Sequence, residues 1–402
     1  MQIQPAQPID AVLPPATIGI LGGGQLGRMM ALAGRHMGYR FRVLDPTPDA
    51  PAAQVADGQV IAAYDDVDAA RRLAAQCDLV TYEFENVSAA VAGALAETCD
   101  VPQGSELLAI CQHRVREKST LAQRGLPVTP FAPISSVGDL DEALQRFGGR
   151  MVVKTCRGGY DGKGQWMVQS RADVERYAQE WARAIDHHRA AGFDDQPLIA
   201  EAYVPFEGEL SVIVARNRRG EVRAFPPAEN IHKRHILHMS IVPARYPEDV
   251  MARAVDVARQ VAEALGVIGL IAVEMFVTQG GEILINELAP RPHNSGHYTL
   301  DACATSQFEQ HVRAICNLPL GDVTLYSPVV MVNVLGQHVN PLLAQMSGLP
   351  SCVKVHLYGK AEAKRDRKMG HVNIVVDEVA RALQWVEACG IWADTESARG
   401  SG

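Results

Sequence analysis

Residues 270–297, LIAVEMFVTQGGEILINELAPRPHNSGH, are the stretch on which the interpretation of the whole chain depends. Two apolar runs flank Gly280 and Gly281. A glycine pair between strand-like runs is typical of a two-residue hairpin turn, because such turns need positive φ. With that turn, Glu274 is predicted to lie directly opposite Glu287, with the two Cβ atoms about 5 Å apart.

Two glutamates that face each other repel, so the pairing needs a compensating charge. A divalent cation such as Mg²⁺ supplies it, because hard cations take carboxylate oxygens and keep substrate phosphates as further ligands. Asn286 adds a neutral oxygen, and the polar tail APRPHNSGH is typical of a binding site. We therefore predict a Mg²⁺ site at Glu274 and Glu287. The alternative is an edge hairpin with two solvated glutamates.

The composition is that of a soluble globular protein. A chain of 402 residues, 47% apolar and 21% charged, is long enough for two or three domains with real cores. The net charge of −8 argues against broad nucleic-acid binding, and no apolar run reaches the roughly 18 residues of a membrane span. The eight cysteines include no CxxC pair, which favours reduced thiols in a cytoplasmic enzyme over a disulfide framework.

Residues 16–112 are predicted to form a parallel α/β domain, because strand-like and helix-like segments alternate. The loop Gly22-x-Gly24-x-x-Gly27 opens the first helix, and Asp45 follows eighteen residues later. This spacing matches the dinucleotide-binding fingerprint. Free N–H groups at a helix N-terminus suit any phosphate, however. A dinucleotide, a phosphorylated metabolite and a tight turn without ligand all remain open.

Other polar residues follow strands further along the chain. Glu83 is placed at the carboxyl edge of the parallel sheet, where ligands sit in such folds. A β-branched strand delivers Lys154 to the glycine-rich loop RGGYDGKGQ, and a lysine with backbone N–H groups can hold nucleotide phosphates without a P-loop. Glu201 and Val204 could offer backbone groups to an adenine, and Glu209 could reach a ribose. Each glutamate taken singly is also compatible with an ordinary surface strand.

The remaining stretches give weaker signals. A zinc site in the histidine-rich residues 230–244 is disfavoured because no cysteine or helical H-x-x-x-H accompanies them, so a loop that holds His232 near phosphates is preferred. Helices are predicted over 248–265 and 300–315. The basic run YGKAEAKRDRKMGH is either a solvated hairpin or an anion clamp.

In this order, these motifs resemble the ATP-grasp enzymes, and more narrowly the N5-carboxyaminoimidazole ribonucleotide synthase family of purine biosynthesis. The matching motifs are GGGQLGRM, VVKTCRGGYDGKGQ, EAYV, Glu209, INELAPRPHNSGH and YGK…RKMGH. The resemblance covers residues 16–390. It implies mixed α/β and α+β architecture, with segments that run as follows: a flexible arm (1–15), an N-terminal parallel α/β pre-ATP-grasp domain (16–112), a small central ATP-grasp lobe (113–205), a C-terminal ATP-grasp domain with a β-rich end (206–395) and a tail (396–402).

The resemblance also implies which residues meet each ligand. The ATP-binding set would be Arg114, Lys118, Lys154, Gly159, Tyr160, Asp161, Gly162, Lys163, Gly164, Gln165, Glu201, Ala202, Tyr203, Val204, Glu209, His232, Asn286 and Glu287. Glu274 and Glu287 would hold Mg²⁺. The set around aminoimidazole ribonucleotide would be Gln25, Leu26, Glu83, Tyr160, Asp161, Arg291, His293, Asn294, Ser295, Lys360 and Arg367. In that set Lys360 and Arg367 would meet the phosphate, and Arg365 could replace Arg367.

The implied reaction is the carboxylation of aminoimidazole ribonucleotide by bicarbonate, through carboxyphosphate, with release of ADP and phosphate. Catalytic roles are expected for His293, Asp161, Lys360 and Arg291. His293 is the candidate base, because a neutral imidazole exists near pH 7, and Asp161 is the alternative. The glycine-rich loop and the 230–240 loop are expected to exclude water as lids.

The family commonly has a glycine where this chain has His235, which leaves the path of the 230–240 loop open. A cytoplasmic homodimer that binds neither nucleic acid nor membrane is implied. Two other functions remain: another ATP-grasp ligase or formate-dependent transferase for a different ribonucleotide amine, and an NAD-dependent oxidoreductase that uses the Gly22–Gly27 loop. The oxidoreductase hypothesis leaves residues 154–165 and the glutamate hairpin unexplained.

Overall fold

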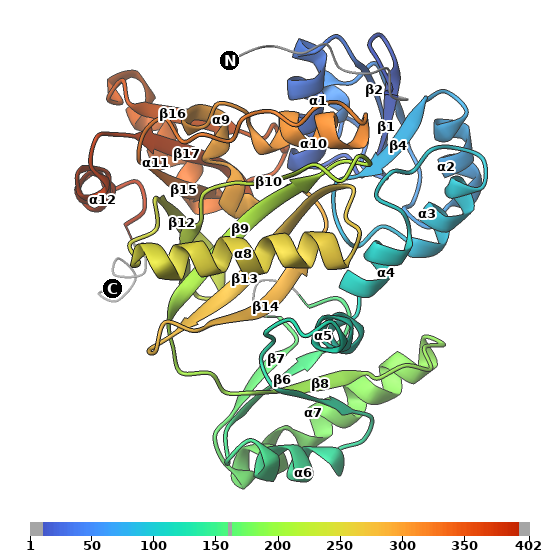
Figure 1. Cartoon of the computed structure of the whole chain (residues 1–402), viewed down its shortest axis with the longest axis vertical. Coiled ribbons are helices and arrows are strands. Elements are labelled where there is room, and N and C mark those ends of the chain that lie inside the picture. The colour runs from blue at the N-terminus through green and yellow to red at the C-terminus, as the bar shows by residue number, and fades with distance from the viewer. Residues whose placement is uncertain (1–10, 160–162, 394–402) are drawn as a thin grey trace, which may run out of the picture.

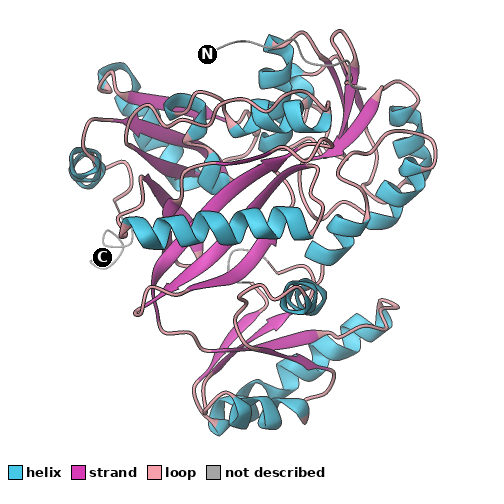
Figure 2. Ribbon diagram, in the orientation of Figure 1, coloured by secondary structure: helices cyan, strands magenta, loops and turns pink. Residues whose placement is uncertain are grey.

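The structure is a computed structural model that describes residues 11–159 and 163–393 of the chain. Three sheets organise it, and helices cover their faces (Figure 1; Figure 2). In the described ranges, no helix combines the length and the apolar character needed to cross a membrane.

The N-terminal sheet is parallel, with strand order β3-β2-β1-β4, which confirms the predicted α/β domain. Its elements are β1 (Thr17–Leu21), α1 (Gln25–His36), β2 (Arg40–Leu44), η1 (Ala53–Val55), β3 (Gly58–Val60), α2 (Val67–Ala74), β4 (Leu79–Tyr82) and α3 (Ala89–Ala96). Apolar residues of α1 at helical spacing, among them Met29 and Met30, pack against Phe308 from the distant helix α10 (Gln307–Ile315). The first domain is therefore joined to the C-terminal part by a shared core.

A small lobe contains the second sheet, which is antiparallel with order β5-β8-β6-β7. It lies at the bottom of Figure 1, in green. Its elements are β5 (Phe131–Ile134), α6 (Asp139–Arg146), β6 (Met151–Thr155), β7 (Gln165–Val168), α7 (Arg171–Ala190) and β8 (Leu198–Ala202), after α4 (Glu106–Cys111) and α5 (Arg114–Gln123). Trp181 of α7 is fully buried against Met151 and Val153 of β6. This core fixes the strands that carry Lys154 and Glu201.

The third sheet has nine strands in the order β14-β13-β9-β11-β12-β15-β17-β16, with β10 beside β9. These strands are β9 (Phe206–Arg216), β10 (Val222–Ala224), β11 (Ala228–Lys233), β12 (Ile236–Val242), β13 (Gly269–Thr278), β14 (Ile283–Ala289), β15 (Val329–Leu335), β16 (Val353–Leu357) and β17 (Lys368–Val375). Helix α8 (Glu248–Ala264) runs across one face in Figure 1, where Ala254, Ala258 and Val261 pack on β9 and β13. The opposite face of these strands packs at one end against Ala302 and against Ala314 of α10, and it faces the cleft at the other end.

Shorter elements complete the C-terminal part: η2 (Asn294–Gly296), α9 (Thr299–Ala302), η3 (Gly336–His338), α11 (Val339–Gln345), η4 (Met346–Gly348) and α12 (Val379–Ala388). The single helix predicted over 300–315 is wrong, because the structure has α9 and α10 separated by an extended segment. Ser306 causes the break: its hydroxyl accepts a hydrogen bond from the Glu309 N–H at 3.1 Å and so caps α10.

The β13–β14 hairpin confirms the predicted pairing of Glu274 with Glu287 but not the predicted turn. The Thr278 N–H donates to the Glu282 carbonyl at 3.0 Å, so the loop contains residues 279–281, three rather than two. Gly281, with φ of +74°, takes the left-handed position that such loops require. A β-bulge next to Glu274 then shifts the register back by one residue.

Candidate active site

A cleft of about 700 Å³ lies where the small lobe faces the nine-stranded sheet, a size that suits a small-molecule ligand. Most of the predicted ATP-binding residues line it, namely Arg114, Lys154, Gly159, Lys163, Gly164, Gln165, Glu201, Ala202, Tyr203, Val204, Glu209, His232, Asn286 and Glu287. Arg291, His293, Asn294 and Glu274 line it as well. Tyr160, Asp161 and Gly162 lie outside the described residues.

Lys154 reaches the cleft from β6 and is held by a buried carboxylate. Its ammonium donates to Glu201 Oε2 at 3.0 Å and to Asn286 Oδ1 at 3.4 Å. Burial alone would raise the pKa of Glu201, but the charges of Lys118, Lys154 and Arg114 lower it to about 2. Glu201 is therefore ionised and fixes Lys154 where it can meet an anionic ligand.

Lys118 lies behind the cleft and does not line it. It is 1% exposed, and its ammonium donates to the carbonyl oxygens of Ile285 and Asn286 at 3.3 and 3.0 Å. Its Nζ is 3.6 Å from Glu201 Oε2. In this structure Lys118 thus holds the backbone of β14 against the small lobe, in addition to balancing Glu201.

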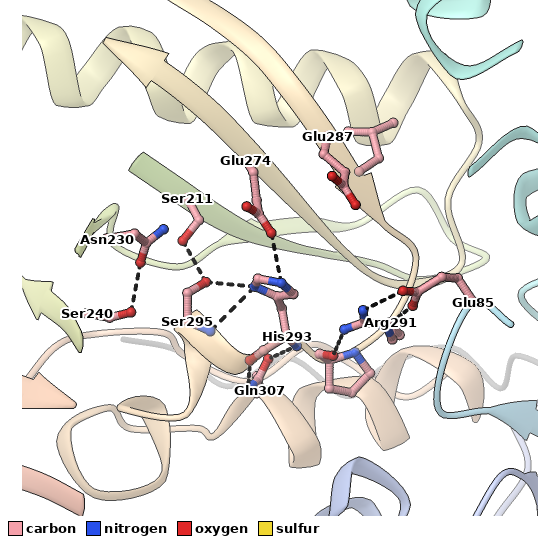
Figure 3. Close-up of polar contacts among 12 residues, drawn as sticks. Glu85, Ser211, Asn230, Ser240, Glu274, Glu287, Arg291, His293, Ser295 and Gln307 are labelled. Carbon is pink, nitrogen blue, oxygen red and sulfur yellow. Dashed lines mark hydrogen bonds and ion pairs between the residues drawn. The ribbon is translucent and has the colours of Figure 1, made fainter. Parts of the chain in front are cut away.

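The two glutamates predicted to bind a metal stand on neighbouring strands and face the same side (Figure 3). Glu274 Oε1 is 2.9 Å from His293 Nε2, and Glu287 Oε2 is 2.9 Å from Arg114 Nη1. Burial would raise the pKa of Glu274, but the contact with His293, with help from His232 and Arg291, lowers it to about 2. The pair thus presents negative charge to the cleft.

This donor set fits Mg²⁺ better than a metal held by protein alone. Over residues 11–159 and 163–393, no group of three or more His, Cys, Asp or Glu side chains is placed to hold a metal ion. Mg²⁺ typically takes one or two carboxylates and completes its shell with water and substrate phosphates. Glu274 and Glu287 supply those two carboxylates, and the Asn286 amide oxygen lies beside them at the cleft.

The tail after β14 is fixed by contacts that the sequence did not reveal. Arg291 forms a two-pronged ion pair with Glu85, in which Nη2 donates to Oε1 at 2.9 Å (Figure 3). Gln307 binds the backbone of His293 twice, accepting from its N–H at 2.8 Å and donating to its carbonyl at 2.7 Å. Both amide atoms of Asn294 are buried without a hydrogen-bond partner in the described part of the chain, which leaves them for a ligand at the cleft.

The glycine loop of the first domain does not offer the open phosphate cradle that its spacing suggested. The N–H groups of Gly24 and Gly27 donate to the Glu83 carboxylate, the latter at 2.6 Å, and the Gly23 N–H donates to Asp45 at 2.8 Å. Asp45 is buried and also accepts from Tyr64 at 2.7 Å, so it cannot reach a ribose. The dinucleotide interpretation thus loses both of its recognition groups.

In the basic run, Lys360 and Arg367 lie outside the lining of the large cleft, whereas Lys368 lines it. The Lys360 ammonium donates to the Lys368 carbonyl at 2.8 Å. Burial and the charge of Arg367 lower the pKa of Lys360 to about 8, and Glu83 opposes the shift. The fold thus brings Glu83, Lys360 and Arg367 close enough for their charges to interact. Within this predicted set, Leu26 is a core residue and Ser295 is fully buried, so neither side chain faces open space.

The loop that contains His235 takes a defined path. Arg234 and His235 have φ of +51° and +64° and connect Lys233 to its partner Ile236 as a two-residue turn with both φ positive. Both line the cleft. This left-handed geometry explains why glycine suits the position, and this chain adopts it with histidine.

Several cleft residues were missed by the sequence interpretation. Phe206 and Phe276 stack with ring centroids 4.6 Å apart, and Asn230 accepts from the Ser240 hydroxyl at 2.8 Å. Their positions on β9, β11 and β13 follow from strand register, which one sequence does not supply. Glu85, which also lines the cleft, was not missed, because it follows the same strand as Glu83 and the sequence places both at the carboxyl edge of that sheet.

Three family models match consecutive parts of the chain. A ribonucleotide synthetase preATP-grasp domain matches residues 15–112, an ATP-grasp domain matches 119–308, and a phosphoribosylaminoimidazole carboxylase C-terminal domain matches 329–384. The first match coincides with the parallel sheet, the ATP-grasp match spans the small lobe and strands β9–β14, and the third match covers strands β15–β17.

Known proteins resemble the chain over nearly its full length. The N5-carboxyaminoimidazole ribonucleotide synthase of Bacillus subtilis is 47% identical over 90% of this chain and 92% of its own. The crystal structure of an N5-carboxyaminoimidazole ribonucleotide synthetase in its ADP complex superposes with a TM-score of 0.89 at 51% identity, covering 95% and 98%. The Aspergillus clavatus enzyme, in complex with ADP and 5-aminoimidazole ribonucleotide, gives 0.83 at 29% identity, covering 93% and 97%.

Proposed function

The chain belongs to the N5-carboxyaminoimidazole ribonucleotide synthase family of ATP-grasp enzymes, and we propose that its large cleft is where ATP drives the carboxylation of 5-aminoimidazole ribonucleotide. It is accordingly an ATP-dependent carbon–nitrogen ligase of purine biosynthesis. The observation that carries the proposal is the opposed pair Glu274 and Glu287, which faces a cleft that also contains Lys154. Negative and positive groups at these positions suit a metal–nucleotide complex.

Lys154 and Arg114 would bind the ATP phosphates. Lys154 is already oriented by Glu201, and Arg114 by Glu287, so little side-chain ordering is left for the moment of binding. Glu274, Glu287 and Asn286 would hold Mg²⁺, which when bound neutralises the charge that moves between the β- and γ-phosphate oxygens. Support for the metal comes from the lowered pKa of Glu274 and from the pairing of Glu274 with Glu287 at the cleft.

Arg291, His293 and Asn294 would meet the ribonucleotide from the same cleft, with Glu83, Lys360 and Arg367 toward its phosphate end. The Glu85 pair fixes the Arg291 guanidinium, and the two Gln307 bonds fix the backbone of His293. Carboxyphosphate formed from bicarbonate would then meet the amine in a shielded space. The amine must lose a proton. Of the two predicted bases, Asp161 lies outside the described residues, and His293 Nε2 lies 2.9 Å from Glu274 Oε1.

We also propose the division into residues 16–112, 113–205 and 206–395, a homodimer, and a cytoplasmic location. The three sheets support the division, and the matched preATP-grasp domain, residues 15–112, supports its first boundary. All eight cysteines are free thiols, which suits a reducing compartment. Light scattering at several concentrations tests the dimer.

The decisive experiment is an ADP-release assay on the full chain with Mg²⁺, ATP and bicarbonate. Release should depend on aminoimidazole ribonucleotide. Glycinamide ribonucleotide with formate should give none, which separates this function from the formate-dependent transferase. Stimulation by that second pair, or NAD binding without ATP binding, would overturn the proposal.

A further inference from the structure

Behind Glu274, a line of hydrogen bonds runs from a buried strand to the edge of the cleft (Figure 3). Ser211 Oγ is 2.6 Å from Ser295 Oγ, Ser295 Oγ is 2.9 Å from His293 Nδ1, and His293 Nε2 is 2.9 Å from Glu274 Oε1. Ser211 on β9 is also the register partner of Glu274 on β13. The line therefore begins and ends on neighbouring strands of one sheet.

The two ring nitrogens of His293 face opposite kinds of group. Nε2 faces a carboxylate, which when ionised only accepts hydrogen bonds, so this contact favours a proton on Nε2. Nδ1 faces the Ser295 N–H at 3.4 Å and the Ser295 hydroxyl at 2.9 Å. A backbone N–H can only donate, so this contact favours Nδ1 as the acceptor. The contacts thus assign Nε2 as the donor and Nδ1 as the acceptor.

The serine protons lead to the same assignment. Both serines are fully buried, at 1% and 0% exposure, and within the described ranges the Ser211 hydroxyl bonds only to Ser295. With Nδ1 as acceptor, the Ser295 hydroxyl donates to the ring and the Ser211 hydroxyl donates to Ser295. Both hydroxyl protons then have an acceptor. With a protonated Nδ1 the line reverses, and the Ser211 proton has no acceptor. A buried donor without a partner costs about 1–3 kcal/mol.

We propose that Ser211 and Ser295 are positioning residues that hold His293 as a hydrogen-bond donor to Glu274 rather than as the base that accepts the amine proton. This deepens the proposed function, on which it rests. His293 occupies Oε1 of Glu274, which leaves Oε2 for a cation. Groups that orient metal-binding carboxylates in this way set metal affinity although they never touch the metal.

The first test reads the tautomer directly, by long-range ¹H–¹⁵N spectra of the full chain labelled at histidine nitrogen. A His293→Gln variant identifies the signals. We expect an unprotonated Nδ1 and a protonated Nε2. The double variant Ser211→Ala/Ser295→Ala removes both hydroxyls together, so no buried donor is left unpaired, and should give a mixture of tautomers. A protonated Nδ1 in the wild type, or an unchanged tautomer in the double variant, would overturn the proposal.

Ser240→Ala is the matched control. Ser240 is a fully buried serine of the same sheet, but its hydroxyl donates to Asn230 rather than toward His293. Its loss should leave the His293 signals unchanged. A change as large as that of the double variant would show that any buried serine perturbs the ring, and would count against a specific relay.

The second test measures the Mg²⁺ concentration that the enzyme requires. The double variant should need about 10–100-fold more Mg²⁺ for half-maximal ATP turnover, while ADP affinity without Mg²⁺ stays the same. Equal losses in both measurements would mean general damage to the cleft and would contradict the positioning role. The tautomer spectra need no turnover. If ADP release does not depend on the ribonucleotide while the spectra still show the Nε2–H form, the proposed function is wrong and the hydrogen-bond assignment of His293 still holds.

Discussion

Replacing Glu201 by glutamine should destabilise the protein by about 3–5 kcal/mol. The substitution keeps the shape of the side chain but removes the charge that balances Lys154 at 3.0 Å and Lys118 at 3.6 Å. Both lysines are buried. Removing one member of a buried ion pair leaves the other charge uncompensated, which destabilises a protein by about 3–5 kcal/mol. The pKa gives a similar figure, because lowering it from 4.5 to about 2 corresponds to about 3 kcal/mol.

The pH dependence has a definite sign. A carboxyl group whose pKa is lower in the folded state stabilises the protein above its unfolded pKa and loses that contribution as the pH falls through the folded value. For Glu201, the difference in unfolding free energy between wild type and variant should be complete above about pH 4.5 and shrink toward pH 2.

Urea unfolding of both proteins, followed by circular dichroism at several pH values, measures this difference. Glu282→Gln is the control, because Glu282 is exposed at the tip of the β13–β14 hairpin and should change stability by less than about 0.5 kcal/mol. A Glu201→Gln effect below about 1 kcal/mol, or one that stays constant with pH, would refute the assignment of Glu201 as the counter-charge of two buried lysines.

Three further predictions concern the cleft. Glu287→Gln should abolish ATP turnover and change stability by less than about 1 kcal/mol, because its carboxylate is 41% exposed beside Arg114; near-normal turnover would contradict the metal assignment. Lys360→Ala should raise the KM for the ribonucleotide far more than that for ATP, and equal increases would place Lys360 elsewhere. His235→Gly should stabilise the protein by about 1 kcal/mol in urea unfolding by relieving φ of +64°, and a loss of stability would mean that side-chain contacts outweigh the backbone strain.

The alternation of strands and helices and the hairpin were predictable because they depend on local patterns. The parallel order of the first sheet follows from such alternation, and the two apolar runs around Gly280 and Gly281 do pair. The helix predicted over 300–315 failed for a local reason as well. Apolar spacing continued through the segment, and the cap at Ser306 carried the decisive signal.

The hydrogen-bond partners of the site residues were not predictable, because a sequence shows residue types but not which side chains come into contact. The fingerprint around Gly24 and Gly27 indicates an acidic ligand, and its N–H groups do bind a carboxyl group, but that group belongs to Glu83 of the same chain. Lys118, which the family resemblance places among the ATP-binding residues, binds carbonyl oxygens of β14 in this structure. Gln307, which fixes His293, carries no motif at all.

The pair of Glu274 and Glu287 shows how a correct prediction can rest on an incomplete reason. The loop has one residue more than a two-residue turn, which by itself would place Glu274 opposite Asn286 and turn Glu287 to the other face. The bulge beside Glu274 adds the compensating residue on β14. Because side chains alternate along a regular strand, Asn286 and Glu287 could not both face the cleft without it. The irregularity that a sequence pattern cannot show is therefore what sets an amide oxygen and two carboxylates around one position, opposite Lys154.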